Sequence, residues 1–311
     1  MFGKNTIDRA ARVESEIGSG GGGAVYKAWH TRLQKYVVLK EQKYIPENDI
    51  KTRRNEFEAL KKVECKYLPQ VFDFVKKGGR SAIVMELVEG ESFDKLLKRG
   101  MRFNRIQVLR WYGQLAFALE VIHREGICHR DIKPSNIMLT PCGDICLIDF
   151  NAALVRGNSI RFISCSLGYA SPEQLALFKQ HEAKPVAPVR KIRSESELYS
   201  RYGVDAKPTE NNTDFVDGDH PDKASLYSSD GIDWQRSDIY SLGATIYHLL
   251  TGIHPPGRAE ESVALLRFSH LDKELTAVLE KSMQTKPSAR FASAKALSQA
   301  LQNMQRPGNP E

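Results

Sequence analysis

The chain contains 311 residues and has a formal net charge of +7, from 45 Lys and Arg against 38 Asp and Glu; this charge suits anionic ligands but does not by itself predict nucleic-acid binding. Hydrophobic residues at 41% and aromatic residues at 9% are values of a globular protein, which excludes wholesale disorder. The N-terminal sequence MFGKNTIDRAARVESEIG lacks an apolar run and no later stretch is long enough to span a bilayer, so we expect neither a secretory signal nor a membrane segment in this chain.

The first eighty-odd residues predict a strand-rich unit. Residues 24–40 contain two runs rich in β-branched and aromatic residues, AVYKAWH and LQKYVVLKE. Residues 48–63 place Phe57, Leu60 and Val63 on one side and charges on the other, which predicts an amphipathic helix. Two further strands are predicted at 70–75 and 81–88, on either side of the turn signal KKGGR.

The next part of the chain predicts helices. Asn104 is a suitable N-cap, and Gln107 three residues later completes a capping box. Apolar residues then recur at helical spacing until Gly126, which indicates a long helix. The remaining predicted elements are a short hairpin of strands 137–139 and 145–148, and helices at 238–250 and 292–303.

A polar segment rich in Pro, Ser and Asn interrupts this pattern between residues 179 and 233. Segment 184–193 contains four cations and no anion, whereas segment 205–222 contains six acidic residues against Lys207. Long segments of this kind within compact domains are either functional or disordered. We therefore predict a flexible insert at 179–233, and the sequence leaves open whether it regulates the protein or is a tolerated insertion.

A glycine-rich motif lies near the N-terminus, where GSGGGGAV from Gly18 to Val25 fits G-x-G-x-x-G-x-V. Glycines allow backbone N–H groups to approach phosphate oxygens, although four consecutive glycines are also typical of a flexible turn. A dinucleotide-binding motif requires a helix after the loop and an acidic residue about twenty positions later. Here a strand follows and the later residue is Lys40, which argues against a dinucleotide.

Lys40 closes the apolar strand VVL, and Glu56 lies on the predicted helix that follows. A Lys–Glu pair bridging strand and helix would hold the ammonium group against the phosphates of a nucleotide. Glu58 is the competing partner, but it lies on the opposite side of a helix from Glu56.

The most informative segment is HRDIKPSN, from His129 to Asn136, followed by Asp149-Phe150-Asn151 after a short strand. Phosphoryl transfer requires a carboxylate that orients a hydroxyl group, oxygen ligands for Mg²⁺ and a cation near the γ-phosphate. The two segments supply these groups in the expected order, with Asp131, Lys133, Asn136 and Asp149.

With these motifs, the sequence resembles the eukaryotic-type protein kinase superfamily over about residues 10–303. GYASPEQ and SDIYSLGATIYHLLTG are most similar to bacterial Ser/Thr kinases. The resemblance implies a bilobal α+β fold with a β-rich N-lobe and a mainly helical C-lobe. The implied boundaries are tails at 1–9 and 304–311, an N-lobe at 10–85, a hinge at 86–88, and a C-lobe at 89–303 that includes the insert.

The resemblance also implies a role for each matching residue. Asp131 is expected to be the catalytic base and Lys133 to neutralise charge on the γ-phosphate. Lys40 is expected to bind the α- and β-phosphates and to pair with Glu56. The expected Mg²⁺ ligands, with Mn²⁺ as the alternative ion, are Asn136 and Asp149. The expected ATP-binding residues are Ile17, Gly18, Gly20, Gly23, Val25, Val38, Lys40, Met85, Glu86, Val88 and Met138.

Further matches concern residues that support the site. Asp238 is similar to the buried aspartate that braces the catalytic loop, and Arg290 to the arginine that pairs with the glutamate of A-P-E, here Glu173. Ser166 occupies the position near Asp131 where Ser/Thr kinases commonly have Thr.

The implied function is ATP- and Mg²⁺-dependent phosphorylation of Ser and Thr in protein substrates, including the chain itself through self-association. The alternative is a pseudokinase that binds nucleotide as a scaffold; we expect no nucleic-acid partner. Five scattered cysteines predict a reducing, cytoplasmic environment and no disulfide scaffold.

Two departures from the family pattern lead to specific expectations. Asn151 replaces the glycine of D-F-G, and because Asn tolerates positive φ we expect Asp149 to retain Mg²⁺ binding in a less mobile loop. Arg130 is a candidate receptor for a phosphate on Ser159 or Ser164. In the insert, the candidate autophosphorylation sites are Ser194, Ser196, Ser200 and Thr209.

Overall fold

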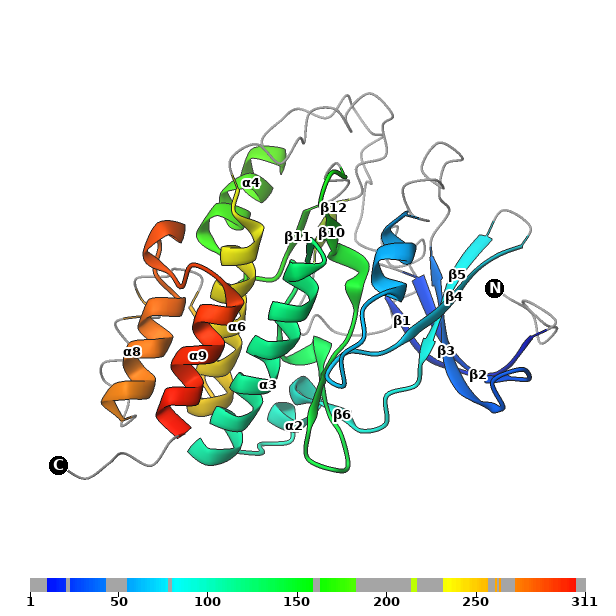
Figure 1. The fold of residues 1–311 in the computed structure, drawn as a ribbon, viewed down its shortest axis with the longest axis horizontal. Coiled ribbons are helices and arrows are strands. Elements are labelled where there is room, and N and C mark those ends of the chain that lie inside the picture. Colours follow the sequence, from blue (N-terminus) through cyan, green and yellow to red (C-terminus); the bar gives the residue numbers. More distant parts are fainter. Residues whose placement is uncertain are drawn as a thin grey trace, which may run out of the picture.

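The computed structural model describes residues 10–20, 23–42, 55–77, 80–158, 163–182, 214–216, 232–256, 261, 263 and 272–305. Within these ranges, an antiparallel sheet at one end of the molecule adjoins a mainly helical part at the other (Figure 1). The predicted two-lobed α+β architecture is therefore confirmed. Most of the predicted insert lies outside the described residues, as do Ser159, Ser194, Ser196, Ser200 and Thr209.

The β-rich lobe contains a five-stranded sheet with the order β1-β2-β3-β5-β4. Its strands are β1 (Ala11–Gly20), β2 (Gly23–His30), β3 (Lys35–Gln42), β4 (Val71–Lys77) and β5 (Arg80–Glu86). The sequence did not predict β1. The residues of this strand from Glu14 to Ser19 are exposed, so little hydrophobic periodicity marks it as a strand.

The register of the sheet places the predicted ATP-binding residues of this lobe. Val25 of β2 lies opposite Lys40 of β3, and Val38 lies opposite Met85 of β5. Gly20 pairs with Gly23, so the glycine-rich motif forms the connection between β1 and β2. One face of the sheet has its own small core, formed by Ala11, Tyr26, Ala28, Val37, Leu39 and Val84.

The described part of the predicted helix at 48–63 is helical over residues 55–61. As its amphipathic pattern predicted, Phe57, Leu60 and Val63 are buried. They belong to the main hydrophobic cluster, which also contains residues of the helical lobe such as Leu115 and Ile239. This helix therefore packs against both parts of the molecule.

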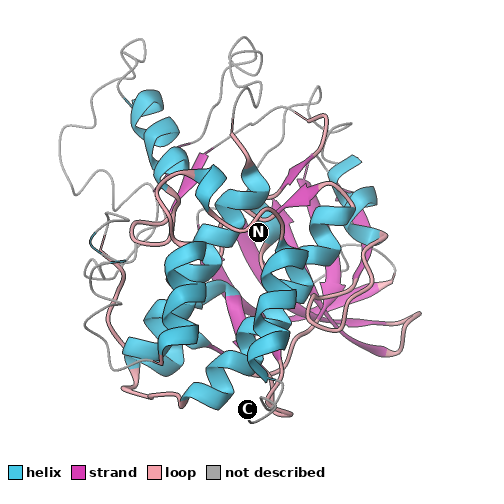
Figure 2. Ribbon diagram, turned by 60° about the vertical axis from the view of Figure 1, so that its left-hand side comes forward, coloured by secondary structure: helices cyan, strands magenta, loops and turns pink. Residues whose placement is uncertain are grey.

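The helical lobe contains α2 (Phe93–Lys98), α3 (Arg105–Arg124), α4 (Pro172–Glu182), α6 (Trp234–Thr251), α8 (Lys273–Ser282) and α9 (Ala294–Gln305). The capping box at the start of α3 is formed as predicted, because the Asn104 side chain accepts from the Gln107 N–H and the Gln107 side chain accepts from the Asn104 N–H. Helix α6 is followed by the C-cap Gly252, whose φ of 68° suits glycine. Figure 2 shows the helices gathered beside the sheet.

Short strands flank the segments HRDIKPSN and DFN between these helices. They are β6 (Glu91–Ser92), β7 (Ile127–Cys128), β8 (Ile137–Leu139), β9 (Ile145–Leu147), β10 (Leu154–Val155), β11 (Ile163–Cys165) and β12 (Asp214–Val216). The predicted hairpin is the pair β8–β9, whereas the pairs β7–β10 and β11–β12 were not predicted. Two- and three-residue strands are too short for period-two alternation to be visible in a sequence. Among the helices in the described part of the chain, none has the length and apolar character needed to cross a bilayer.

Candidate active site

Asp131 lies at the centre of a buried hydrogen-bonded cluster. Its Oδ1 accepts a hydrogen bond from Ser166 Oγ at 2.8 Å, and its Oδ2 accepts from Asn136 Nδ2 at 3.0 Å. Lys133 Nζ lies 3.0 Å from the same Oδ2 and donates to Ser166 Oγ at 2.9 Å. The carboxylate is therefore oriented by three side chains, one of them a cation.

The turn before Asp131 is held by a carboxylate from α6. Asp238 is fully buried and accepts from the backbone N–H groups of His129 at 2.8 Å and Arg130 at 2.7 Å. His123 Nε2 lies 2.9 Å from Asp238 Oδ2. Arg130 has a φ of 66°, an unusual conformation for a residue with a side chain, and these bonds stabilise it. The predicted bracing role of Asp238 agrees with this geometry.

Asp149 and Asn136 are brought together by the backbone. Ile148 N–H donates to the Asn136 carbonyl at 2.8 Å, and the ring of His129 lies 5.0 Å from that of Phe150. The amide group of Asn136 is fixed because Nδ2 also donates to the Asp131 carbonyl at 2.8 Å. Its oxygen Oδ1 is therefore the atom that could coordinate a metal ion. Carboxylate and amide oxygens are the donors that Mg²⁺ prefers, so the two side chains fit this ion.

Lys40 Nζ pairs with Asp149 Oδ1 at 2.6 Å. Burial raises the pKa of Asp149, but the Lys40 ammonium and the N–H of Asn151 outweigh it and hold the pKa below its ordinary value. The unusual backbone lies at Asp149, with a φ of 69°, and not at Asn151. The tolerance of Asn for positive φ is therefore not needed at position 151, because Asn151 lies in the 3₁₀ turn Phe150–Ala152.

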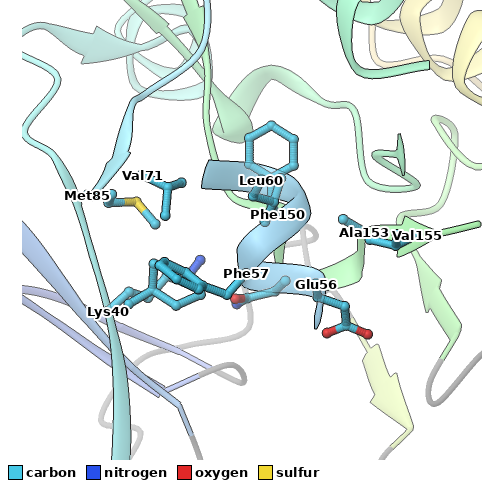
Figure 3. A pocket seen from close by; sticks show the side chains of 11 residues that line it. Lys40, Glu56, Phe57, Leu60, Val71, Met85, Phe150, Ala153 and Val155 are labelled. Carbon is cyan, nitrogen blue, oxygen red and sulfur yellow. The ribbon is translucent and has the colours of Figure 1, made fainter. Parts of the chain in front are cut away.

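The partner predicted for Lys40 was Glu56. Figure 3 shows the Glu56 carboxylate directed away from the Lys40 ammonium, and Glu56 Oε1 accepts from Asn158 Nδ2 at 3.5 Å. Both residues line a small cavity of about 30 Å³, together with Met85 and Phe150. In this arrangement, Lys40 therefore holds Asp149, and its predicted pairing with Glu56 is not the one that the structure presents.

The remaining predicted ATP-binding residues lie on β1, at the end of β5, after β5 and on β8. Ile17 and Gly18 lie on β1, and Ile17 is 51% exposed. Glu86 ends β5 and is tied to Gln70, whose N–H donates to the Glu86 carboxylate at 3.1 Å. Val88 follows in the connection to β6, and Met138 lies on β8 opposite Ser92.

Glu173 and Arg290 form the predicted ion pair. The two guanidinium nitrogens of Arg290 lie 2.6 and 2.8 Å from the two carboxylate oxygens of Glu173. Arg290 also donates to the carbonyl groups of Gln284, Arg236 and Thr285, and its side chain is fully buried. A bidentate pair with these extra bonds fixes the start of α4 against the C-terminal helices.

Arg130 is packed differently from the prediction of a phosphate receptor. It is buried, and its guanidinium carbon lies 4.4 Å from the ring centroid of Trp234, the first residue of α6. Desolvation lowers the pKa of Arg130 to about 10. Ser164, one of the two phosphorylation sites predicted to pair with Arg130, is fully buried on β11. Phosphorylation of Ser164 would therefore require β11 to leave its present position.

Gln174 is a site residue that the sequence analysis missed. Its amide Nε2 donates to the carbonyl of Arg130 at 2.8 Å and to that of Ser164 at 2.6 Å. Gln174 is 1% exposed and follows Glu173 directly. Its position next to the predicted Glu173 was the one available signal, because a buried glutamine cannot be told from an exposed one by spacing alone.

Comparisons with known proteins agree with this geometry. The family model for the protein kinase domain matches residues 11–187. A probable serine/threonine-protein kinase of Clostridium acetobutylicum is 34% identical over 170 residues, covering 52% of this chain and 26% of that protein. Serine/threonine-protein kinase PknL of Mycobacterium tuberculosis is 28% identical over 276 residues, covering 86% of this chain and 55% of PknL. PknA of the same species is 32% identical over 196 residues, covering 59% of this chain and 45% of PknA. This chain therefore spans between about a quarter and about half of the length of these relatives.

Proposed function

The chain belongs to the protein kinase domain family, and we propose that it transfers the γ-phosphoryl group of ATP to Ser and Thr hydroxyl groups of proteins. The observation that carries the proposal is the Asp131 carboxylate held by Ser166, Lys133 and Asn136. A carboxylate fixed in this way can accept the proton of a substrate hydroxyl group while the adjacent ammonium group lies near the transferred phosphate.

We propose that ATP binds between the lobes, against Val25, Val38, Met85 and Met138, with hinge residues 86–88 along the adenine. The register that places Val25 opposite Lys40 and Val38 opposite Met85 supports this site, because it gathers these residues near one strand. When ATP binds, the Lys40 ammonium group would leave Asp149 and would contact the phosphates and Glu56 instead.

Asn136 and Asp149 would hold Mg²⁺, or Mn²⁺ as the alternative ion. When bound, the ion supplies positive charge that neutralises the phosphate oxygens. The chain itself contributes orientation, because Asn136 is fixed through Asp131 and Asp149 through the N–H of Asn151.

The proposed partners are Ser- and Thr-containing proteins, among them a second copy of the chain during autophosphorylation. The five cysteines, all free thiols, support a reducing cytoplasmic environment. A pseudokinase has less support, since the residues that phosphoryl transfer needs are present and hydrogen-bonded.

The first test is incubation of the purified chain with Mg²⁺ and γ-labelled ATP, beside Asp131→Asn and the control Asp73→Asn. Asp73 is an exposed acid on β4, so the control makes the same chemical change outside the hydrogen-bonded cluster around Asp131. Label should appear on Ser and Thr and should fall by about 10²- to 10⁴-fold in Asp131→Asn alone, the range for loss of a general base. An initial rate of labelling per molecule of chain that rises with protein concentration would support autophosphorylation between copies.

Absence of label from the unaltered chain, with ATP binding still shown by a thermal shift, would contradict the proposed activity and favour the pseudokinase. Equal labelling of all three proteins would contradict the role of Asp131.

A further inference from the structure

Strand β12 comes from the insert and pairs with β11, which lies between Asp149 and Glu173 in the segment that we call the activation segment. The pairing is antiparallel, with Ile163 opposite Val216, Ser164 opposite Phe215 and Cys165 opposite Asp214. The two strands lie side by side in Figure 1, although about fifty residues separate them in the sequence. A part of the insert is therefore seated on the activation segment.

The opposite edge of β11 is also occupied. The Ser164 carbonyl accepts from Gln174 Nε2, which donates at the same time to the carbonyl of Arg130. In an antiparallel ladder, alternate residues direct their N–H and C=O groups to opposite edges. Because Ser164 faces Gln174, we infer that Ile163 and Cys165 exchange hydrogen bonds with β12. Strand β11 is then held from both sides.

Two routes lead from β11 to the catalytic carboxylate. Ser166 follows Cys165 directly and donates to Asp131 Oδ1 at 2.8 Å. Gln174 joins β11 to the carbonyl of Arg130, the residue before Asp131. A displacement of β11 would therefore move Ser166, which binds the Asp131 carboxylate, and Gln174, which binds the backbone next to Asp131.

The packing of Arg130 also indicates that protein contacts order the activation segment. Its guanidinium is buried against Trp234, near the point where the insert rejoins the helical lobe. Ser164 is buried as well. In this arrangement the activation segment is ordered by protein contacts, with neither Arg130 nor Ser164 presented to solvent.

We propose that β12 is a built-in clasp that orders the activation segment, and that Gln174 is a positioning residue that transmits this order to the catalytic loop. The insert thereby supports catalysis from within the chain. The inference rests on the proposed kinase activity for its kinetic test, but the strand contact can be tested independently of activity.

The alternation along β12 provides a matched pair of variants. Val216→Pro removes an N–H that faces β11, whereas Phe215→Pro removes one that faces away, and proline is tolerated at such positions of an edge strand. Val216→Pro should lower kcat about threefold to tenfold, the effect of about one net hydrogen bond. The KM for ATP should not change, because the proposed ATP site lies elsewhere. Phe215→Pro should resemble the unaltered chain.

Hydrogen exchange of the peptide that contains Ile163–Cys165 gives the readout that does not depend on activity. Exchange should become faster in Val216→Pro and stay unchanged in Phe215→Pro. Equal exchange in all three proteins would overturn the strand contact, whether or not the chain is a kinase. Equal kcat values, with the unaltered chain active, would overturn the clasp while leaving the proposed function intact.

A rise in kcat or a fall in the KM for a peptide substrate in Val216→Pro would also overturn the clasp, since it would show that β12 competes with substrate. The Gln174 route is tested by Gln174→Met alone and combined with Val216→Pro. If β12 acts through Gln174, the double variant should lose little more kcat than Gln174→Met. Multiplicative losses would overturn that route.

Discussion

At the scale of single residues, the candidate site depends on two backbone conformations that side chains rarely adopt. Arg130 and Asp149 have φ values of 66° and 69°, and each such residue costs about 1–3 kcal/mol. Asp238 stabilises the first through two backbone N–H groups, and Lys40 stabilises the second through the carboxylate. The unfavourable backbone energy is thus offset by contacts of two carboxylates, Asp238 beside Arg130 and Asp149 itself.

Asn151 provides a prediction at this scale. Its backbone N–H donates to Asp149 Oδ1 at 3.1 Å, and glycine retains that group. Asn151→Gly should therefore change kcat by less than about tenfold, or about 1.4 kcal/mol of activation free energy. Asn151→Pro lacks the N–H and should lose more activity. Steady-state kinetics of both variants check this, and a gain of orders of magnitude in Asn151→Gly would contradict it.

At the scale of elements, α3 and α6 support the loop that contains Asp131. Helix α3 contains buried residues along its whole length, from Val108 to His123. Helix α6 is buried over most of its length and supplies Asp238 to the loop that follows α3. Two buried helices fixed against each other therefore set the position of Asp131 more firmly than a surface loop could by itself.

The capping box of α3 offers an element-scale prediction. Asn104→Ala removes the acceptor for the Gln107 N–H and should lower the free energy of unfolding by about 1 kcal/mol. Asn104→Asp keeps an acceptor and should cost much less. Chemical denaturation of the two variants measures the difference. Equal losses in both would show that the cap contributes nothing beyond the helix itself.

At the scale of the whole molecule, the interior consists of unequal cores. The main cluster combines residues of the helical lobe with Phe57, Leu60 and Val71, whereas the sheet has its own cluster around Val37 and Leu39. The helix at 55–61 and Val71 of β4 are thus packed with the helical lobe. Glu56 belongs to this helix, so a movement of the whole helix towards Lys40 would also move side chains of the main core.

The stability of the whole molecule should depend on His248. Burial, together with the nearby charges of His254 and Arg102, lowers the pKa of His248 to about 4. The carboxylate of Asp94 raises the pKa and opposes them in part. The hydroxyl group of Tyr169 lies 2.6 Å from Nδ1 of the ring. Since the unfolded chain binds this proton with a pKa of 6.5, the contribution of neutral His248 is complete above pH 6.5 and is lost as the pH falls towards 4.

Melting temperatures at pH 7.5 and pH 5 test this linkage. His248→Asn keeps an acceptor near Tyr169 but does not titrate, so its melting temperature should fall less between the two pH values than that of the unaltered chain. The comparison concerns the change with pH and not the starting value, which loss of the ring lowers. An equal or larger fall in the variant would contradict the role assigned to His248.

The sequence by itself determined the order of the motifs along the chain and much of the local structure. Ordered motifs predicted Asp131, Asn136 and Asp149 as site residues, because the proposed chemistry requires particular residue types at particular spacings. The cap at Asn104 and the buried face of Phe57 and Leu60 were predictable, because capping and amphipathicity are local properties. The strands β1, β11 and β12 were not, since an exposed or very short strand leaves no periodic signal.

Tertiary structure alone decided which groups meet. Lys40 pairs with Asp149 across 109 positions of sequence, Gln174 joins Arg130 to Ser164, and β12 lies on the activation segment. Each contact unites segments whose spacing along the chain carries no information about their distance in space. The physical reason is that burial and hydrogen bonding select partners among all groups that the packed helices bring together, whereas a sequence pattern reports only on neighbours along one element.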